Sequence, residues 1–126
     1  MIIGLGIDIV EVDRMERAIE RWGDSFLRKV FTEREIGYSG RRRYSSQHLA
    51  ARFAAKEAVV KAFGEPRAFP VRWTDIEVIN DAEGKPIVEL RNDALKAKKA
   101  KGVTGVVLSL SHTKEHAVAN ALLVKE

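Results

Sequence analysis

The sequence contains no cysteine among its 126 residues, so disulfides are excluded and a structural zinc site nearly so. No apolar run approaches the roughly twenty residues that a membrane-spanning helix needs. The start, Met1–Gly4, lacks the basic flank of a secretory signal. We therefore expect an intracellular, cytoplasmic protein with no membrane partner.

The size and charge of the chain indicate one domain and an acidic partner, but they do not identify the function. A chain of this length with 45% hydrophobic residues fits one compact domain, which we expect to span residues 1–126. It carries 22 Lys and Arg against 18 Asp and Glu, a net charge of +4. This charge favours an acidic partner, which composition leaves open as a nucleic acid, a phosphorylated small molecule or an acidic protein.

The period of the hydrophobic residues changes along the chain and predicts both strands and helices. The expected elements are a strand at Ile2–Val10, a helix at Glu11–Trp22 ended by Gly23, a short helix after Thr32 that stops near Gly37 and Gly40, a helix at Gln47–Phe63, strands at Trp73–Ile79 and Ile87–Leu90, a helix from Asn92 or Asp93 to Gly102, and a hairpin of Val106–Ser111 and Ala117–Val124. This order predicts an α+β domain with a mainly antiparallel sheet and packed helices.

The first strand has two unlike faces. Its apolar face carries Ile3, Leu5, Ile7 and Ile9. On the other face Gly4 and Gly6 leave the strand bare beside Asp8, so that a ligand or another backbone can approach closely. A carboxylate at the end of an apolar strand is usually a turn or cap residue, and Asp8 is open to either interpretation.

The helix at Gln47–Phe63 carries charges that its composition does not explain. Alanines and large apolar residues leave no continuous polar face, so the helix should be buried nearly all round. Arg52, Lys56, Glu57 and Lys61 nevertheless lie within it, and buried charges need partners or a ligand. The simplest interpretation of Glu57 and Lys61 is an ordinary ion pair at i, i+4 spacing. Alternatively, Glu57 and Asp8 supply the carboxylates that hold Mg²⁺ together with substrate phosphates.

The helix at Glu11–Trp22 sorts its side chains by charge. Arg14, Arg17 and Arg21 gather on one arc, which is either a solvated face or a docking stripe for an acidic protein. His112 lies in a predicted turn, where a single histidine is more often structural than functional.

Several stretches match the motifs of one family in order and spacing. They are Gly4–Val10 followed by Arg14, Phe31-Thr32 with Glu35, Arg52–Ala58 with Lys61–Gly64, Asp75–Val78, Gly84–Pro86 and Ser109–Thr113. The string Arg52–Ala58 is highly specific. The sequence therefore resembles, over nearly its whole length, the holo-[acyl-carrier-protein] synthases, the small group of 4′-phosphopantetheinyl transferases.

The resemblance implies an enzyme that transfers 4′-phosphopantetheine from coenzyme A to a serine of apo acyl carrier protein. The reaction releases 3′,5′-ADP and gives holo acyl carrier protein for fatty acid synthesis. The resemblance also implies Mg²⁺ as the cofactor, coenzyme A and an acidic acyl carrier protein as partners, and no nucleic acid. It further implies a homotrimer with active sites at the subunit interfaces.

The resemblance assigns the catalytic roles to three residues. Asp8 and Glu57 would bind the metal, and Lys61 would lie beside the phosphoanhydride bond that breaks. Glu57 would accept the serine proton, directly or through a metal-bound water.

Substrate and carrier contacts are implied in the same way. Arg52 and His112 would bind the phosphates of coenzyme A. Arg14 and Arg21 would dock the acidic carrier protein.

One stretch departs from the family pattern. Many relatives have a glycine-rich segment after the signature helix, whereas this chain has Gly64–Pro70. Pro66 and Pro70 lack amide donors, so this loop would hold coenzyme A differently, or Arg67 would replace backbone amides with a side-chain charge.

Two other classes of function compete with this interpretation. A nucleic-acid-binding domain would use Arg41–Arg43 and the lysines of Lys96–Lys101, although the basic groups are dispersed and the aromatic content is only 7%. A metal-dependent phosphodiester hydrolase would use Asp8, Glu57 and Lys61.

Overall fold

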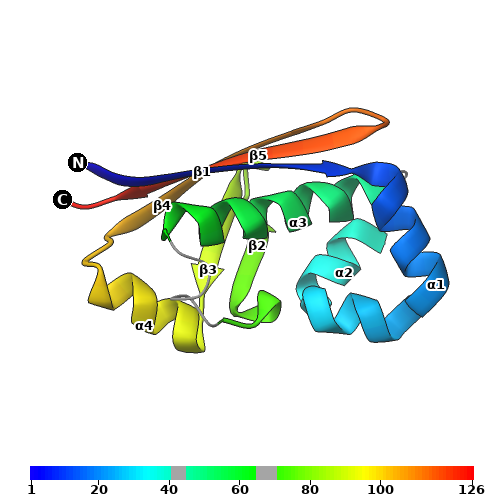
Figure 1. Ribbon diagram of the computed structural model, residues 1–126, viewed down its shortest axis with the longest axis horizontal. Helices are drawn as coiled ribbons and strands as arrows, with labels where there is room; N and C mark the ends of the chain where they lie inside the picture. The colour runs from blue at the N-terminus through cyan, green and yellow to red at the C-terminus, as the bar shows by residue number, and fades with distance from the viewer. Residues whose placement is uncertain (41–44, 65–70) are drawn as a thin grey trace.

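The computed structural model describes residues 1–40, 45–64 and 71–126 (Figure 1). In chain order the elements are β1 (Ile2–Glu11), α1 (Val12–Val30), α2 (Glu33–Gly40), α3 (Ser45–Ala62), the 3-10 helix η2 (Trp73–Asp75), β2 (Ile76–Asn80), β3 (Pro86–Leu90), α4 (Asn92–Ala100), β4 (Gly105–His112) and β5 (His116–Val124). Both sheets are antiparallel, so the predicted α+β architecture is confirmed. No helix in the described part of the chain is long and apolar enough to cross a membrane.

Helix α3 is the centre of the fold. It lies between a three-stranded sheet in the order β1-β5-β4 and the hairpin of β2 and β3, with α1 and α2 at one end and α4 at the other (Figure 1). Its alanines are almost fully buried and form the core together with Val59, Ile76 and Leu123. Small side chains allow the backbone of α3 to approach the sheet closely, and this approach decides which face of β1 is buried.

The glycine face of β1, and not its isoleucine face, packs against α3. A Cβ atom on Gly6 would overlap the carbonyl oxygen of Ala58, and one on Gly4 would overlap that of Ala62. The sequence left open whether a ligand or another backbone approaches the glycine face. The structure shows that it is the backbone of α3. The opposite face points outward, and Leu5, with 65% of its surface exposed, lies on it.

Two predicted boundaries were wrong. Gly23 does not end the first helix: it takes a left-handed φ of 56°, and α1 resumes after this kink and continues to Val30. The stretch from Trp73 begins as the single turn η2, and strand β2 starts only at Ile76.

Lys56, one of the unexplained charges of α3, is fully buried and fully satisfied by protein groups. Its ammonium donates to Glu35 Oε1 at 2.7 Å and to the carbonyl oxygens of Val30 at 2.8 Å and Trp73 at 3.0 Å. Glu35 also accepts the backbone N–H of Thr32. Burial lowers the pKa of Lys56, while Glu35 acts to raise it. These three contacts of the Lys56 ammonium link α3 to α1, α2 and η2. They set which side of α3 faces each of these elements.

Candidate functional site

Asp8 and Lys61 meet at the junction of β1 and α3. Asp8 lies on the buried glycine face of β1, and its Oδ1 accepts a hydrogen bond from Lys61 Nζ at 2.7 Å. The same ammonium donates to the carbonyl oxygen of Ile7 at 3.2 Å. The expected ion pair between Glu57 and Lys61 is therefore wrong, because Lys61 pairs with a strand that helical spacing cannot reveal. Asp8 raises the pKa of Lys61, so that the ammonium stays charged.

Glu57 faces the same carboxylate. Burial, followed by a hydrogen bond with Asp8 and by repulsion from its charge, raises the pKa of Glu57 to about 7. The raised pKa favours the neutral, protonated form of Glu57 while Asp8 keeps its charge beside Lys61. The second oxygen of Asp8 is buried and has no hydrogen-bond partner within the described residues.

The donor set of this corner fits a hard divalent cation. A cation can replace the proton that Glu57 tends to hold and can bind the unpartnered oxygen of Asp8. No group of three or more metal-binding side chains occurs in the described parts of the chain. Two carboxylates would leave the other positions of such a cation to water and to oxygen atoms of the substrate, as is usual for Mg²⁺ bound with phosphates. We call Asp8, Glu57 and Lys61 the carboxylate corner.

A mainly apolar pocket adjoins the carboxylate corner. It has a volume of about 240 Å³ and lies where α1 passes over α3. Arg14 and Met15 come from α1, whereas Phe53 and Glu57 come from α3. A group bound on α1 can therefore reach Glu57 directly.

The arginine arc of α1 borders this pocket and is open to solvent. Arg14, Arg17 and Arg21 line a shallow groove of about 400 Å³ together with Trp22. The guanidinium of Arg21 lies 4.9 Å from the ring centre of Trp22, which is 56% exposed. Arg14 lines both this groove and the apolar pocket, so the basic arc continues as far as the pocket that contains Glu57.

Arg52 lies on a different side of α3. Its guanidinium donates to Asn80 Oδ1 at 2.7 Å and lies 4.3 Å from the ring centre of Tyr38. These residues line a pocket of about 390 Å³ between α2, α3 and the β2–β3 hairpin, which we call the hairpin pocket. At 100° per residue, Arg52 lies about 140° around the helix from Glu57. Within a single chain, Arg52 therefore does not lie at the carboxylate corner.

His112 belongs to the side of Arg52. It ends β4, is exposed, and its Nδ1 lies 3.1 Å from Oε1 of Gln47 in the first turn of α3. Its ring centre is 5.2 Å from that of His48. Arg52 and His112, far apart in sequence, are thus both placed along the N-terminal half of α3.

The sequence did not point to some of the residues in this region. His48 shares the helical stripe of Arg52 at i, i+4 spacing, a signal that could have identified it. Tyr38 and Asn80 come from α2 and β2, and no pattern in the sequence places either beside Arg52. The basic run Arg41–Arg43 and the divergent loop at residues 65–70 lie outside the described residues.

Comparisons with known proteins point to one family. Residues 4–121 match the model of the 4′-phosphopantetheinyl transferase superfamily. The chain is 45% identical over 126 residues to a curated holo-[acyl-carrier-protein] synthase of Clostridium tetani, covering 100% of this chain and 98% of that one. A crystal structure of the synthase from Neisseria meningitidis matches with a TM-score of 0.87 at 31% identity, over 99% of this chain and all of that one. The synthase from Bacillus anthracis in complex with coenzyme A (3′,5′-ADP) matches with a TM-score of 0.79 at 36% identity, over 100% and 99%.

Proposed function

The chain belongs to the 4′-phosphopantetheinyl transferase superfamily and is an enzyme of the holo-[acyl-carrier-protein] synthase type, and we propose on that basis that it modifies an apo acyl carrier protein. It transfers 4′-phosphopantetheine from coenzyme A to a serine of the carrier with Mg²⁺ as the cofactor, and the holo carrier serves fatty acid synthesis. The observation that carries this proposal is the carboxylate corner, where the buried Asp8 and the half-buried Glu57 face each other beside a charged lysine.

The residues of the corner match the needs of the reaction. The serine oxygen bonds to the pantetheine-side phosphorus of coenzyme A, the phosphoanhydride bond breaks, and 3′,5′-ADP leaves with the electron pair. Mg²⁺ held by Asp8 and Glu57 would neutralise charge on the phosphate oxygens. Lys61 can donate to the departing phosphate because its side chain is 52% exposed beside Asp8. Glu57 would accept the serine proton, directly or through a water.

Intact-mass analysis of the carrier tests the proposal. Apo acyl carrier protein incubated with this enzyme, coenzyme A and Mg²⁺ should gain the mass of one phosphopantetheine, and EDTA should prevent the gain. Absence of any gain from a folded enzyme would contradict the transfer. Release of free phosphopantetheine without modified carrier would instead indicate a hydrolase.

The hairpin pocket is the proposed site for the nucleotide end of coenzyme A. Arg52 brings a guanidinium to its wall, and Asn80 is held in place by donating through Nδ2 to the carbonyl oxygen of Gly84 at 2.9 Å. A guanidinium is well suited to phosphate, and Tyr38 adds an aromatic surface to the same wall.

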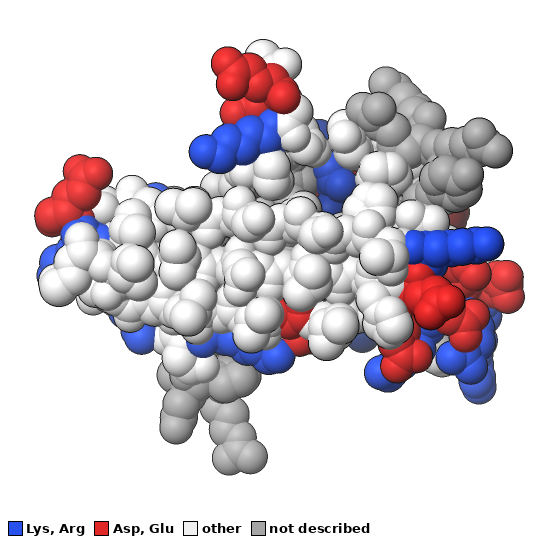
Figure 2. Space-filling model, turned by 90° about the horizontal axis from the view of Figure 1, so that it is seen from above, with Lys and Arg blue, Asp and Glu red and all other residues white. Residues whose placement is uncertain are grey.

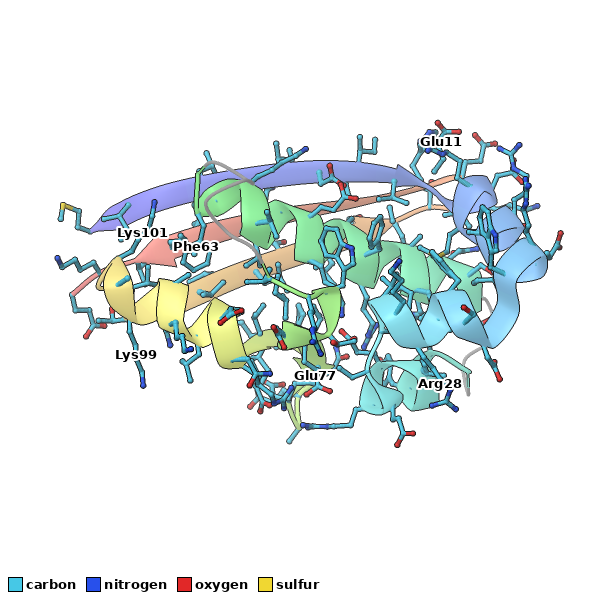
Figure 3. The ribbon with its side chains drawn as sticks, turned by 60° about the horizontal axis from the view of Figure 1, so that its bottom comes forward. Glu11, Arg28, Phe63, Glu77, Lys99 and Lys101 are labelled. Atoms are coloured by element: carbon cyan, nitrogen blue, oxygen red, sulfur yellow. The ribbon has the colours of Figure 1, made fainter. Side chains whose placement is uncertain are left out.

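The arginine arc of α1 is the proposed docking surface for the acidic carrier. Charge reversal of Arg21 to Glu should raise the KM for the carrier roughly tenfold while changing the KM for coenzyme A less than twofold. Lys99→Glu makes the same charge change on α4, at the other end of the molecule from Arg28 of α1 (Figure 3), and should leave both constants unchanged. Steady-state kinetics with each substrate varied in turn would measure these effects. Equal increases in both constants for Arg21→Glu would contradict a docking role.

The outer face of the three-stranded sheet supports a homotrimer, the assembly implied by the family resemblance. Figure 2 shows this face as a broad area without charged side chains, with acidic and basic groups at its margins. The exposed apolar side chains of the face are Ile3, Leu5, Ile7, Ile9 and Val107. An exposed apolar surface of this kind is typical of an interface, and a trimer would also let Arg52 and His112 of one chain approach the carboxylate corner of another.

Self-association is tested by a charge on that face. Light scattering should give the unaltered protein a mass of three times 14.1 kDa, and Leu5→Lys should reduce it to one chain. Trp22→Lys replaces an exposed apolar residue elsewhere, on α1, and should leave the mass unchanged. A single-chain mass for the unaltered protein at micromolar concentration would contradict the trimer.

A further inference from the structure

His112 has few contacts that fix its direction, and two of them come from the first turn of α3. The side chain is exposed at the end of β4. Gln47 Oε1 lies 3.1 Å from its Nδ1, and the ring of His48 meets it at 5.2 Å with the planes inclined by 68°. An exposed histidine at a strand end can adopt several rotamers, so these contacts select one of them.

The contact with Gln47 also fixes which ring nitrogen faces the protein. A carbonyl oxygen only accepts, so Nδ1 of His112 must donate to Gln47. The other nitrogen, Nε2, makes no hydrogen bond within the described residues and remains available. When the ring is protonated, Nε2–H can donate to an anion while Nδ1–H stays bonded to Gln47.

The ring of His48 links His112 to Arg52. His48 contacts Tyr38 edge to face at 6.2 Å on the side of α2, and the guanidinium of Arg52 lies 4.3 Å from the ring centre of Tyr38. The four side chains therefore form a continuous row from β4 to the wall of the hairpin pocket. Arg52 and His112, the two residues that the family resemblance assigns to the coenzyme A phosphates, lie at the two ends of the row.

We propose that Gln47 and His48 are positioning residues that hold His112 in place to bind a phosphate group of the nucleotide substrate. Gln47 anchors Nδ1–H of the ring through its carbonyl oxygen, so that Nε2 faces away from α3, and His48 sets the ring direction through aromatic contact. His48 acts through the contact of its aromatic ring with His112, and this contact does not require a charge on His48. This inference rests on the proposed function, since the family resemblance behind that function assigns His112 to the phosphates of coenzyme A.

Calorimetric titration with 3′,5′-ADP, the released nucleotide, tests the proposal on the full-length protein. His48→Ala removes the ring and should weaken binding roughly three- to tenfold, as expected for loss of one aromatic contact. His48→Phe keeps a ring of similar size without a charge and should bind within about twofold of the unaltered protein. Gln47→Met keeps the length of the side chain without the acceptor and should weaken binding by a similar factor to His48→Ala.

A spectroscopic measurement separates positioning from a general effect on folding. Nitrogen-15 shifts of His112 should show a proton on Nδ1 in the neutral ring of the unaltered protein and of His48→Phe, and a loss of this preference in Gln47→Met. Equal losses of affinity in His48→Phe and His48→Ala would overturn the role of the ring. Unchanged shifts and unchanged affinity in Gln47→Met would overturn the role of Gln47.

The outcomes for the two proposals are distinguishable. An unaltered protein that transfers phosphopantetheine while all three variants bind 3′,5′-ADP normally would remove only the positioning roles. An unaltered protein that neither binds 3′,5′-ADP nor modifies a carrier would remove the proposed function, and the positioning roles with it.

Discussion

Replacing Glu57 with Gln should reduce Mg²⁺-dependent transfer by roughly 10²–10⁴-fold while leaving the protein folded. The variant keeps the shape of the side chain but removes one of the two charges that would hold the cation and the group that would accept the serine proton. Folding should not suffer, because Glu57 already favours its neutral form through burial and the nearby charge of Asp8. The measurement is the initial rate of carrier modification over a range of Mg²⁺ concentrations, with circular dichroism to confirm the fold.

Two comparisons sharpen this prediction. Glu33→Gln makes the same chemical change at an exposed residue that pairs with Arg28, and should leave the rate unchanged. In the metal-free protein, protonation of Glu57 below its pKa of about 7 gives the same neutral state. The Mg²⁺ concentration that half-saturates the unaltered enzyme should therefore rise as the pH falls below 7. Normal turnover by a folded Glu57→Gln enzyme would contradict both roles of Glu57.

Replacing Lys56 with Met should lower the free energy of unfolding by about 3–5 kcal/mol. The substitution removes the counter-charge of a fully buried carboxylate, Glu35, and the ammonium that donates to the carbonyl oxygens of Val30 and Trp73. A loss of this size is a large part of the total stability of a small protein, which is commonly about 5–15 kcal/mol. Urea unfolding followed by circular dichroism would measure it.

The control for Lys56 is a lysine that is not buried. Lys99→Met on α4 removes the same charge from the surface and should change the free energy of unfolding by less than about 0.5 kcal/mol. The double variant Lys56→Met, Glu35→Gln should recover part of the loss, because it leaves no buried unpaired charge. A loss below about 1 kcal/mol for Lys56→Met would show that the buried pair contributes little.

The order of elements could be predicted from the sequence because it depends on local signals. Period-two alternation identified β1, and the alanine-rich period of α3 identified a helix buried on most sides. The buried charges of that helix were correctly expected to need partners, and for Lys56 the partner is Glu35 of the second family motif. The packing of β1 could not be read in the same way. Alternation separates two faces but does not say which one a helix will cover, and here close approach of two backbones selected the glycine face.

The sequence named the residues of the candidate site but did not predict how they are arranged in space. Resemblance supplied Asp8, Glu57 and Lys61, and the structure brings these three together. Helical spacing suggested Glu57 as the partner of Lys61. The partner is instead Asp8 of β1, which is distant in sequence but pairs with the Lys61 ammonium in the fold. The angle between Arg52 and Glu57 around α3 could be calculated from their positions in the sequence. Which elements each residue faces could not, because that depends on how the neighbouring elements pack against the helix.

Helix α3 carries both groups of site residues, on sides about 140° apart, and this arrangement has a consequence for redesign. A change in the rotation of α3 about its own axis would displace the carboxylate corner and the Arg52 side together, so core substitutions near Lys56 should alter nucleotide affinity and turnover in parallel. The arginine arc lies on a separate helix, α1, and lines its own groove. The choice of carrier can therefore be altered on α1 with the catalytic groups left in place, which makes α1 the element on which to begin retargeting this enzyme to a different acceptor.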